Sequence, residues 1–288
     1  MSLIVGTAAG AFSLDDPATP LIAGTRINHV ARDGEGWWAL DGKAQVHKNE
    51  GIVAAAPGGS ALNCIEIGSD VVWIGATEAK LFRLDDGELT EDQAFADAPG
   101  RDGWYTPWGG PPDVRSLARD PSGTLFVNVH VGGIIRYDDE GPIPTIDQDA
   151  DVHQVITHPT LPGLVLAACA RGLARSGDGR VFDFRDEGLH APYCRAVAAI
   201  GDTVLVSAST GPRTSRARIY RADLDRGGFQ PCTDGLPEWF GENLDTHCLT
   251  VLGDAAYAGL GDKVWRSGDE GGSWQLVAEG LPKVTCLA

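Results

Sequence analysis

The sequence is short of positive charge. It contains 23 lysine and arginine residues against 40 aspartate and glutamate residues, which gives a formal net charge of −17, and only five of the basic residues are lysines. Proteins that bind nucleic acids or anionic membranes need clustered lysine and arginine. The composition therefore excludes a general nucleic-acid-binding surface and a basic membrane-binding surface, and we expect neither kind of partner.

Long hydrophobic runs are also missing. No segment approaches the roughly 18 apolar residues needed to span a bilayer. The N-terminus has neither the basic region nor the apolar region of a secretory signal peptide. We therefore expect a soluble protein in a reducing compartment, the cytoplasm.

The six cysteines form no disulfide or metal-binding framework. There is no Cys-x-x-Cys pair and no Cys/His spacing typical of zinc. Cys64, Cys248 and Cys286 share one position of a repeat, at which other copies have serine or alanine. Because small residues at one repeat position indicate burial, we expect free, buried thiols. The sequence predicts neither a metal site nor a cofactor.

Helical periodicity is absent. No window has a sustained 3.6-residue apolar period, so we expect almost no helix. The 38 glycines and 17 prolines are typical of many short strands joined by turns. With 43% hydrophobic residues, the chain can still build a substantial core.

One pattern recurs along the chain. A short apolar strand is followed by a turn rich in Gly, Asp and Pro, a second apolar strand, another turn, and an aliphatic or aromatic residue before Arg and Asp. The first strands begin near residues 26, 62, 114, 152, 194 and 246. The segment beginning near 284 supplies only a first strand, and residues 2–16 supply what should follow it. The two ends of the chain therefore make a seventh unit together.

The repeat length identifies the fold. The mean spacing of about 43 residues is that of a four-stranded propeller blade. We predict an all-β protein, a seven-bladed β-propeller that forms a single domain over residues 1–288. Pairing of the N- and C-terminal segments is expected to close the ring, which protects the sheet edges.

A turn motif lies in the last complete repeat. The run is Ser267-Gly-Asp269-Glu-Gly271-Gly-Ser273-Trp274. Asp and Ser can hydrogen-bond the turn backbone, Gly can adopt a positive φ, and Trp can fill the base of a hairpin. The run matches the S-x-D-x-G-x-S-W pattern, so the chain resembles the BNR or Asp-box repeat propellers, which include sialidases, sortilin-type receptors and photosystem II assembly factors. The resemblance implies the fold and no particular function, and we expect Asp269 to lie on the face opposite any site.

A polar column lies near the start of the first strands. In chain order it holds Asn28, Asn63, Arg115, His153, Arg195, His247 and Thr285. Since the first strand of a blade is innermost, we expect this column to surround one mouth of the central channel. Two arginines and two histidines would favour an anion such as a carboxylate. The alternative is that these groups hydrate or cross-bond the channel.

Long loops are expected to lead to the same face. They span roughly residues 91–112 and 233–244, and their aromatic residues are Trp104, Tyr105 and Trp108 in the first loop and Trp239 and Phe240 in the second. Binding residues often lie on long loops of a rigid scaffold. The aromatic residues would suit a sugar or a small amphipathic ligand, or they pack as a lid over the core.

The favoured prediction is a binding scaffold. Its partner would be a small anionic or carbohydrate-like ligand, or a protein or peptide, at the channel mouth. The alternative is a glycoside hydrolase of the sialidase type, or another hydrolase, at the same place. Sialidases, as a family, carry an Arg-Ile-Pro motif and have six blades, whereas this chain has Arg26-Ile27-Asn28 and seven repeats. No catalytic residue can be named, and a metal at His130, His153 and His247 is a third, least favoured hypothesis.

Overall fold

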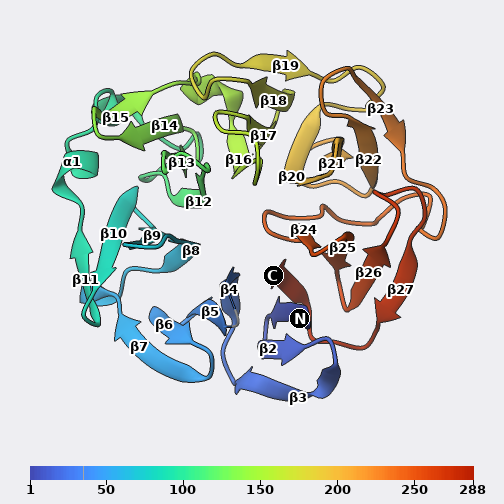
Figure 1. Cartoon of the computed structure of the whole chain (residues 1–288), viewed down its shortest axis with the longest axis horizontal. Helices are drawn as coiled ribbons and strands as arrows, with labels where there is room; N and C mark the ends of the chain where they lie inside the picture. Colours follow the sequence, from blue (N-terminus) through green and yellow to red (C-terminus); the bar gives the residue numbers. More distant parts are fainter. Residues whose placement is uncertain (35) are drawn as a thin grey trace. The chain divides into compact units, whose positions relative to one another are not determined.

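The structure is a computed structural model that describes residues 1–34 and 36–288. Over these residues, the strands form seven four-stranded antiparallel sheets. The fold is an all-β, seven-bladed β-propeller, as predicted, and each sheet can be followed in Figure 1. The helical segments in this part of the chain are short: α1 (Gln93–Ala96) and the 3-10 turns η1 (Pro57–Gly59), η2 (Arg101–Gly103) and η3 (Gln148–Ala150). None of the helices over these residues is long and apolar enough to cross a membrane.

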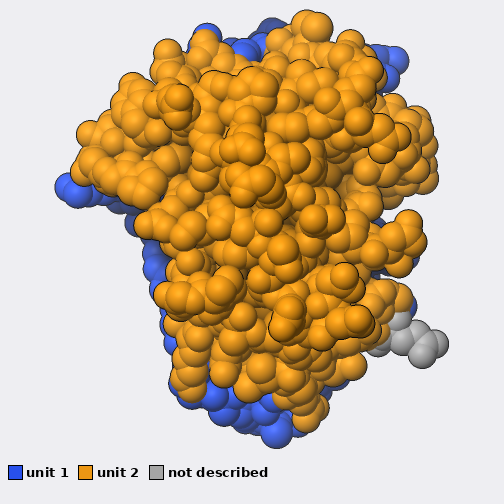
Figure 2. Space-filling view, turned by 90° about the vertical axis from the view of Figure 1, so that its left-hand side faces the viewer, with its two compact units in different colours: residues 1–27, 168–174, 184–288 blue, residues 28–167, 175–183 orange. Residues whose placement is uncertain are grey.

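The chain divides into two compact units, which Figure 2 colours separately. Unit 1 comprises residues 1–27, 168–174 and 184–288, and unit 2 comprises residues 28–167 and 175–183. One of the seven sheets has residues in both units. Its strands are β16 (Val152–Thr157), β17 (Val165–Cys169), β18 (Gly172–Ser176) and β19 (Asp183–Arg185).

Unit 1 contains three further sheets. The first consists of β28 (Val284–Leu287), β1 (Ile4–Thr7), β2 (Gly10–Ser13) and β3 (Asp16–Ala23). The second consists of β20 (Tyr193–Ile200), β21 (Thr203–Ser209), β22 (Ala217–Asp223) and β23 (Gly227–Pro231). The third consists of β24 (Leu249–Leu252), β25 (Ala255–Leu260), β26 (Lys263–Ser267) and β27 (Gln275–Ala278).

The other three sheets belong to unit 2, apart from Ile27, the first residue of β4. The first consists of β4 (Ile27–Asp33), β5 (Gly36–Asp41), β6 (Gln45–Lys48) and β7 (Gly51–Ala55). The second consists of β8 (Leu62–Ile67), β9 (Val72–Ala76), β10 (Lys80–Asp85) and β11 (Glu88–Glu91). The third consists of β12 (Val114–Arg119), β13 (Leu125–Val129), β14 (Gly133–Asp138) and β15 (Gly141–Pro144).

Strand β28 joins the C-terminal segment to the N-terminal strands. It pairs with β1 in antiparallel register, with Gly6 opposite Cys286. A Cβ atom at Gly6 would lie 2.3 Å from the Cys286 sulfur, so only glycine allows the two strands to approach this closely. The pairing closes the ring of blades, as the sequence predicts.

One first strand starts later than expected. Strand β24 begins at Leu249 and not near residue 246. The cause is a turn, because His247 has a φ of 65° and the Cys248 amide donates to the Asp245 carbonyl oxygen at 3.0 Å. A positive φ at a histidine depends on its surroundings, so an apolar-pattern argument does not detect it.

Burial differs between inner strands and outer strands of the sheets. All five residues of β13 (LFVNV) are buried, whereas four of the five residues of the outer strand β7 (GIVAA) are exposed. A strand covered on both faces carries a continuous apolar run. The six cysteines are buried thiols, as predicted. Burial raises the pKa of the Cys194 thiol to about 12.

The run from Ser267 to Trp274 forms the turn between β26 and β27. Asp269 Oδ1 accepts from the Ser273 amide at 2.8 Å, and its Oδ2 accepts from the Ser273 hydroxyl at 2.8 Å. Ser267 Oγ accepts from the Gly271 amide at 2.9 Å, and Gly271 has a φ of 81°. The Trp274 indole is buried and donates to the Gly271 carbonyl oxygen at 3.3 Å. The motif thus stabilises a turn through its own side chains.

The two serines of this turn should differ in their effect on stability. Ser267→Ala removes the acceptor of the buried Gly271 amide, and we expect a loss of about 1–2 kcal/mol in the free energy of unfolding. Ser273→Ala is the matched control, because its hydroxyl bond to Asp269 is exposed and should contribute less. Urea denaturation measures both, and equal losses would contradict this assignment.

Candidate functional site

Four polar side chains of unit 2 meet at the ends of three strands. Arg115 lies on β12 and His153 on β16, while His130 directly follows β13 and Asp151 directly precedes β16. Because β12 and β13 are antiparallel, the start of one adjoins the end of the other. The sheet geometry therefore brings His130 beside Arg115.

Asp151 lies between the two histidines. His130 Nε2 is 3.1 Å from Asp151 Oδ1, and His153 Nε2 is 3.6 Å from Asp151 Oδ2. Arg115 Nη1 is 3.2 Å from His130 Nε2, and the two imidazole centroids are 5.9 Å apart. The His153 side chain is only 1% exposed, whereas the other members reach solvent in part. The four residues are called the Arg–His–Asp cluster below.

The environment of Asp151 favours its charged form. Burial alone would raise the pKa of this carboxyl, but the His130 and His153 imidazoles beside it lower the pKa well below its usual range. The backbone of Asp151 is left-handed, with φ 48° and ψ 68°. Aspartate tolerates this conformation better than most residues, so the chain directs an ionised carboxylate at both imidazoles.

The first long loop contributes one exposed aromatic side chain to this cluster. The Trp108 indole is 5.2 Å from the His130 imidazole, centroid to centroid, and Trp108 is 67% exposed. Tyr105 is also exposed. Trp104 instead packs at 5.8 Å against the buried Phe95, with the Arg101 guanidinium 5.3 Å from its ring. The loop therefore places Trp108 against the cluster and uses Trp104 for packing.

Three members of the polar column connect neighbouring first strands. The Asn28 amide donates to the Leu62 carbonyl oxygen at 2.8 Å, and the Asn63 amide donates to the Val114 carbonyl oxygen at 3.2 Å. In unit 1, the Thr285 hydroxyl donates to the Ile27 carbonyl oxygen at 2.6 Å. These three contacts are the cross-bonding that was the alternative explanation of the column.

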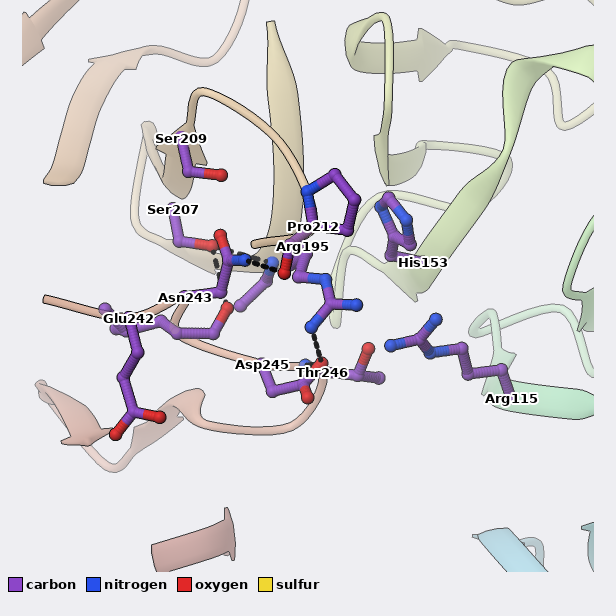
Figure 3. A network of polar contacts seen from close by, with 12 residues as sticks. Arg115, His153, Arg195, Ser207, Ser209, Pro212, Glu242, Asn243, Asp245 and Thr246 are labelled. Atoms are coloured by element: carbon purple, nitrogen blue, oxygen red, sulfur yellow. Dashed lines mark hydrogen bonds and ion pairs between the residues drawn. The ribbon is translucent and has the colours of Figure 1, made fainter. Parts of the chain in front are cut away.

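Arg195, the arginine of the polar column in unit 1, lies near an acidic residue. Arg195 Nη1 is 3.2 Å from Asp245 Oδ1 (Figure 3). His247 lies in the turn before β24. The Asn243 amide fixes the preceding loop by donating to the Gly211 carbonyl oxygen at 3.1 Å (Figure 3).

The second long loop forms an arginine–aromatic group in unit 1. The guanidinium carbons of Arg216 and Arg218 lie 4.3 and 4.1 Å from the Trp239 ring. His190 packs edge-on to the same ring at 4.8 Å, and burial with the two nearby arginines lowers the His190 pKa. Phe240 is 4% exposed and packs 5.5 Å from Trp265, so it belongs to the core.

Two carboxylates of the second long loop pair with basic side chains. Glu238 Oε1 is 3.6 Å from Arg218 Nη2, and Glu242 Oε2 is 2.6 Å from Lys283 Nζ. Tyr193 lies 5.7 Å from the Arg195 guanidinium. The two glutamates thus form surface ion pairs and Tyr193 packs near a guanidinium, and neither arrangement favours the sialidase hypothesis.

Sequence reasoning did not single out Asp151, although a signal for it was available. In three repeats, an aspartate stands two residues before an arginine or histidine of the polar column. The pairs are Asp113 and Arg115, Asp151 and His153, and Asp245 and His247. An acid that recurs beside a cation indicates an ion-pairing position. In the structure, Asp151 approaches His130 and Asp245 approaches Arg195.

Comparisons with known proteins show the fold and no family. No protein-family model and no curated protein matches the sequence. Among solved structures, virginiamycin B lyase from Staphylococcus aureus, in a catalytically inactive form with quinupristin, is similar with a TM-score of 0.62 and 14% identity, over 90% of this chain and 88% of that one. YCF48 from Cyanidioschyzon merolae has a TM-score of 0.59 and 12% identity, over 88% and 84%. The WD40 propeller domain of Doa1 has a TM-score of 0.63 and 13% identity, over 96% and 85%. Proteins with such different names share the scaffold, so the likeness does not select a function.

Proposed function

We propose that this propeller is a binding scaffold of the Asp-box type that holds a small anionic ligand, such as a carboxylate, at the Arg–His–Asp cluster. The observation that carries the proposal is the grouping of Arg115, His130 and His153 beneath an exposed indole, Trp108. The chain has a net charge of −17, so its overall electrostatic field repels anions. An arginine and two imidazoles gathered at one place would counteract this repulsion locally and favour the binding of an anion.

The chemistry of the side chains supports this choice. A guanidinium offers paired donors that match a carboxylate, and imidazoles add donors when protonated. Trp108 offers an aromatic face to the carbon part of the ligand, as sugars and small amphipathic molecules require. The Ser267 to Trp274 turn supports the Asp-box assignment.

Ligand binding can be tested by thermal shift and calorimetry with citrate, glucuronate and inorganic phosphate as probes. An anion that binds the folded state raises the melting temperature by mass action. Arg115→Ala should weaken binding by at least about tenfold, because a charge-assisted hydrogen bond is lost. This variant should keep its fold, because the Arg115 side chain is only partly buried.

The control for charge is Arg180→Ala, since Arg180 is exposed in the turn between β18 and β19. It should bind the probes as the wild type does. Unchanged affinity in the Arg115→Ala variant would refute the anion site.

A second candidate function is hydrolysis or another acid–base reaction at the same cluster. The supporting observation is the His130–Asp151 contact of 3.1 Å, because a carboxylate can orient an imidazole as a general base. Virginiamycin B lyase supports the idea that such a propeller can carry an enzyme. A screen with chromogenic glycosides and esters tests it, and any turnover should disappear in Asp151→Asn. Turnover that survives this substitution would place the chemistry elsewhere.

A further inference from the structure

We propose that His130, Asp151 and His153 form a binding site for a divalent transition-metal ion. The three residues are a two-histidine, one-carboxylate set, and their ligand atoms all lie within 4.8 Å of one another. Over residues 1–34 and 36–288, this is the one group of histidine, cysteine, aspartate or glutamate residues whose ligand atoms converge in this way.

The separations suit a single ion. Ligands about 2.1 Å from a metal are roughly 3.0–3.4 Å apart when the angle at the metal is tetrahedral or octahedral. The His130 Nε2 to Asp151 Oδ1 distance is 3.1 Å, and the His153 Nε2 to Asp151 Oδ2 distance is 3.6 Å. All three ligand atoms lie within 4.8 Å of one another, so side-chain rotations must draw the more distant pairs together to coordinate the ion.

The chain holds these ligands in place before any ion binds. His153 is fully buried on β16, and the His130 amide donates to the Asp113 carbonyl oxygen at 2.9 Å. Asp151 is fixed in the left-handed conformation at the end of η3. Uncommon backbone conformations of this kind tend to occur at functional sites, where the surrounding structure maintains them.

The donor set determines the class of ion. Two imidazole nitrogens and one carboxylate suit Zn²⁺, Co²⁺, Fe²⁺ or Mn²⁺ and match the facial arrangement that leaves positions open for other ligands. Ca²⁺ and Mg²⁺ prefer oxygen ligands, so the set disfavours them.

Arg115 must move when a metal binds. Its Nη1 lies 3.2 Å from His130 Nε2, and it must leave that nitrogen when the metal takes the nitrogen lone pair. The half-buried guanidinium would then remain beside the ion.

This inference deepens the proposed function, because a metal would compensate the Asp151 charge within the anion site. Asp151 is an unfavourable neighbour for an anion when no cation binds it. A divalent ion on Asp151 makes the local charge positive and supplies open coordination positions. An anion would then bind to the metal at one end and to Arg115 at the other.

Metal binding can be measured on the full chain after treatment with a chelator. Calorimetric titration with ZnCl₂, in a buffer containing excess MgCl₂ to occupy the surface carboxylates, should give one Zn²⁺ per chain. Elemental analysis of the reloaded and desalted protein should agree. Loading with Co²⁺ should give visible d–d absorption and should quench the fluorescence of Trp108, which lies 5.2 Å from the His130 ring.

Two variants test the ligands directly. His130→Ala and Asp151→Asn should each weaken Zn²⁺ binding by at least about 100-fold, and both residues are partly exposed, so circular dichroism should show an unchanged fold. His190→Ala and Asp254→Asn are the controls for a histidine and a carboxylate elsewhere and should bind as the wild type does. The proposal is overturned if Zn²⁺ does not bind stoichiometrically, or if both ligand variants bind it normally.

The metal site and the anion site can fail separately. Zn²⁺ titration without added citrate or phosphate tests only the metal site. Citrate titration of the chelator-treated protein tests only the anion site, and citrate titration of the Zn²⁺-loaded protein should show at least about tenfold tighter binding. Stoichiometric Zn²⁺ binding with no response to any anion would support the metal site and contradict the proposed function.

Discussion

Deleting residues 284–288 should abolish cooperative folding of the whole domain. The deletion removes β28, the first strand of the sheet β28-β1-β2-β3, and leaves the backbone of β1 unpaired. Val284, Cys286 and Leu287 are all buried, and the loss of each costs about 1.5–3 kcal/mol of hydrophobic stabilisation. The sum approaches the total stability of a typical domain, which is about 5–15 kcal/mol.

Thermal and urea denaturation monitored by circular dichroism measure this effect. The truncated chain should lack a sigmoidal transition, and a synthetic peptide of residues 281–288 should restore part of it. A matched pair of substitutions separates the effect of β28 from a general effect of shortening a valine side chain. Val284→Ala should lower the free energy of unfolding by about 1–2 kcal/mol. Val277→Ala on the outer strand β27 should lower it little, because Val277 is 38% exposed. A cooperative transition of normal midpoint in the truncated chain would contradict the importance of ring closure.

Replacing Glu66 by glutamine should make the stability of the protein less sensitive to pH. Glu66 lies on β8 opposite the buried Trp73. Burial raises the pKa of its carboxyl from 4.5 to about 7, and the charge of Arg119 opposes this rise only in part. The folded state therefore keeps a proton that the unfolded state releases between pH 4.5 and 7.

The sign follows from proton linkage. Raising the pH through this window destabilises the folded wild type, because its carboxyl must ionise in a buried place, and the loss amounts to about 3 kcal/mol above pH 7. Glu66→Gln has no proton to lose. Its free energy of unfolding relative to wild type should therefore rise by about 3 kcal/mol between pH 4.5 and pH 8.

Urea unfolding at several pH values measures this difference. Glu88→Gln, at an exposed glutamate on β11, is the control for removal of one negative charge, and its difference from wild type should vary little with pH. A difference between Glu66→Gln and wild type that does not depend on pH would show that Glu66 is ionised in the folded protein throughout.

The architecture could be predicted from the sequence because a blade is defined by local features. Short apolar strands and glycine-rich turns recur at blade length, and each blade is built from neighbouring segments of chain. The seventh blade required only that Ser2–Asp16 and Lys283–Ala288 complement each other, and β28 does pair with β1. The start of β24 was missed because the left-handed turn at His247 is set by contacts and not by an apolar pattern.

The candidate site was less accessible to sequence reasoning. The polar column placed Arg115 and His153 correctly on first strands, but it also contained Asn28 and Asn63, whose amides join neighbouring strands. Distinguishing the two kinds of residue requires knowing which carbonyl groups lie nearby. Asp151 was overlooked because an aspartate before a strand usually serves a turn, and its approach to His130 depends on how the β13–β14 connection is placed.

The aromatic residues of the loops illustrate the same limit. Trp104 packs beside Phe95 whereas Trp108 remains in solvent next to His130. In the other loop, Phe240 enters the core whereas Trp239 lies near two guanidinium groups. Neighbouring aromatic residues have no difference in sequence pattern that predicts these outcomes, since the free space in the core decides between them.

The pairing of β1 with β28 also sets the order in which the protein can fold. Strands β1, β2 and β3 are synthesised first, but the partner of β1 follows only after almost the whole 288-residue chain. Contacts between such distant segments form slowly, because a long loop must close before they gain any stabilisation. During synthesis, the edge of β1 that pairs with β28 therefore stays unpaired until the end of the chain has been made. This unpaired edge is where the nascent chain is most prone to mispair and where binding by a chaperone would prevent mispairing most effectively.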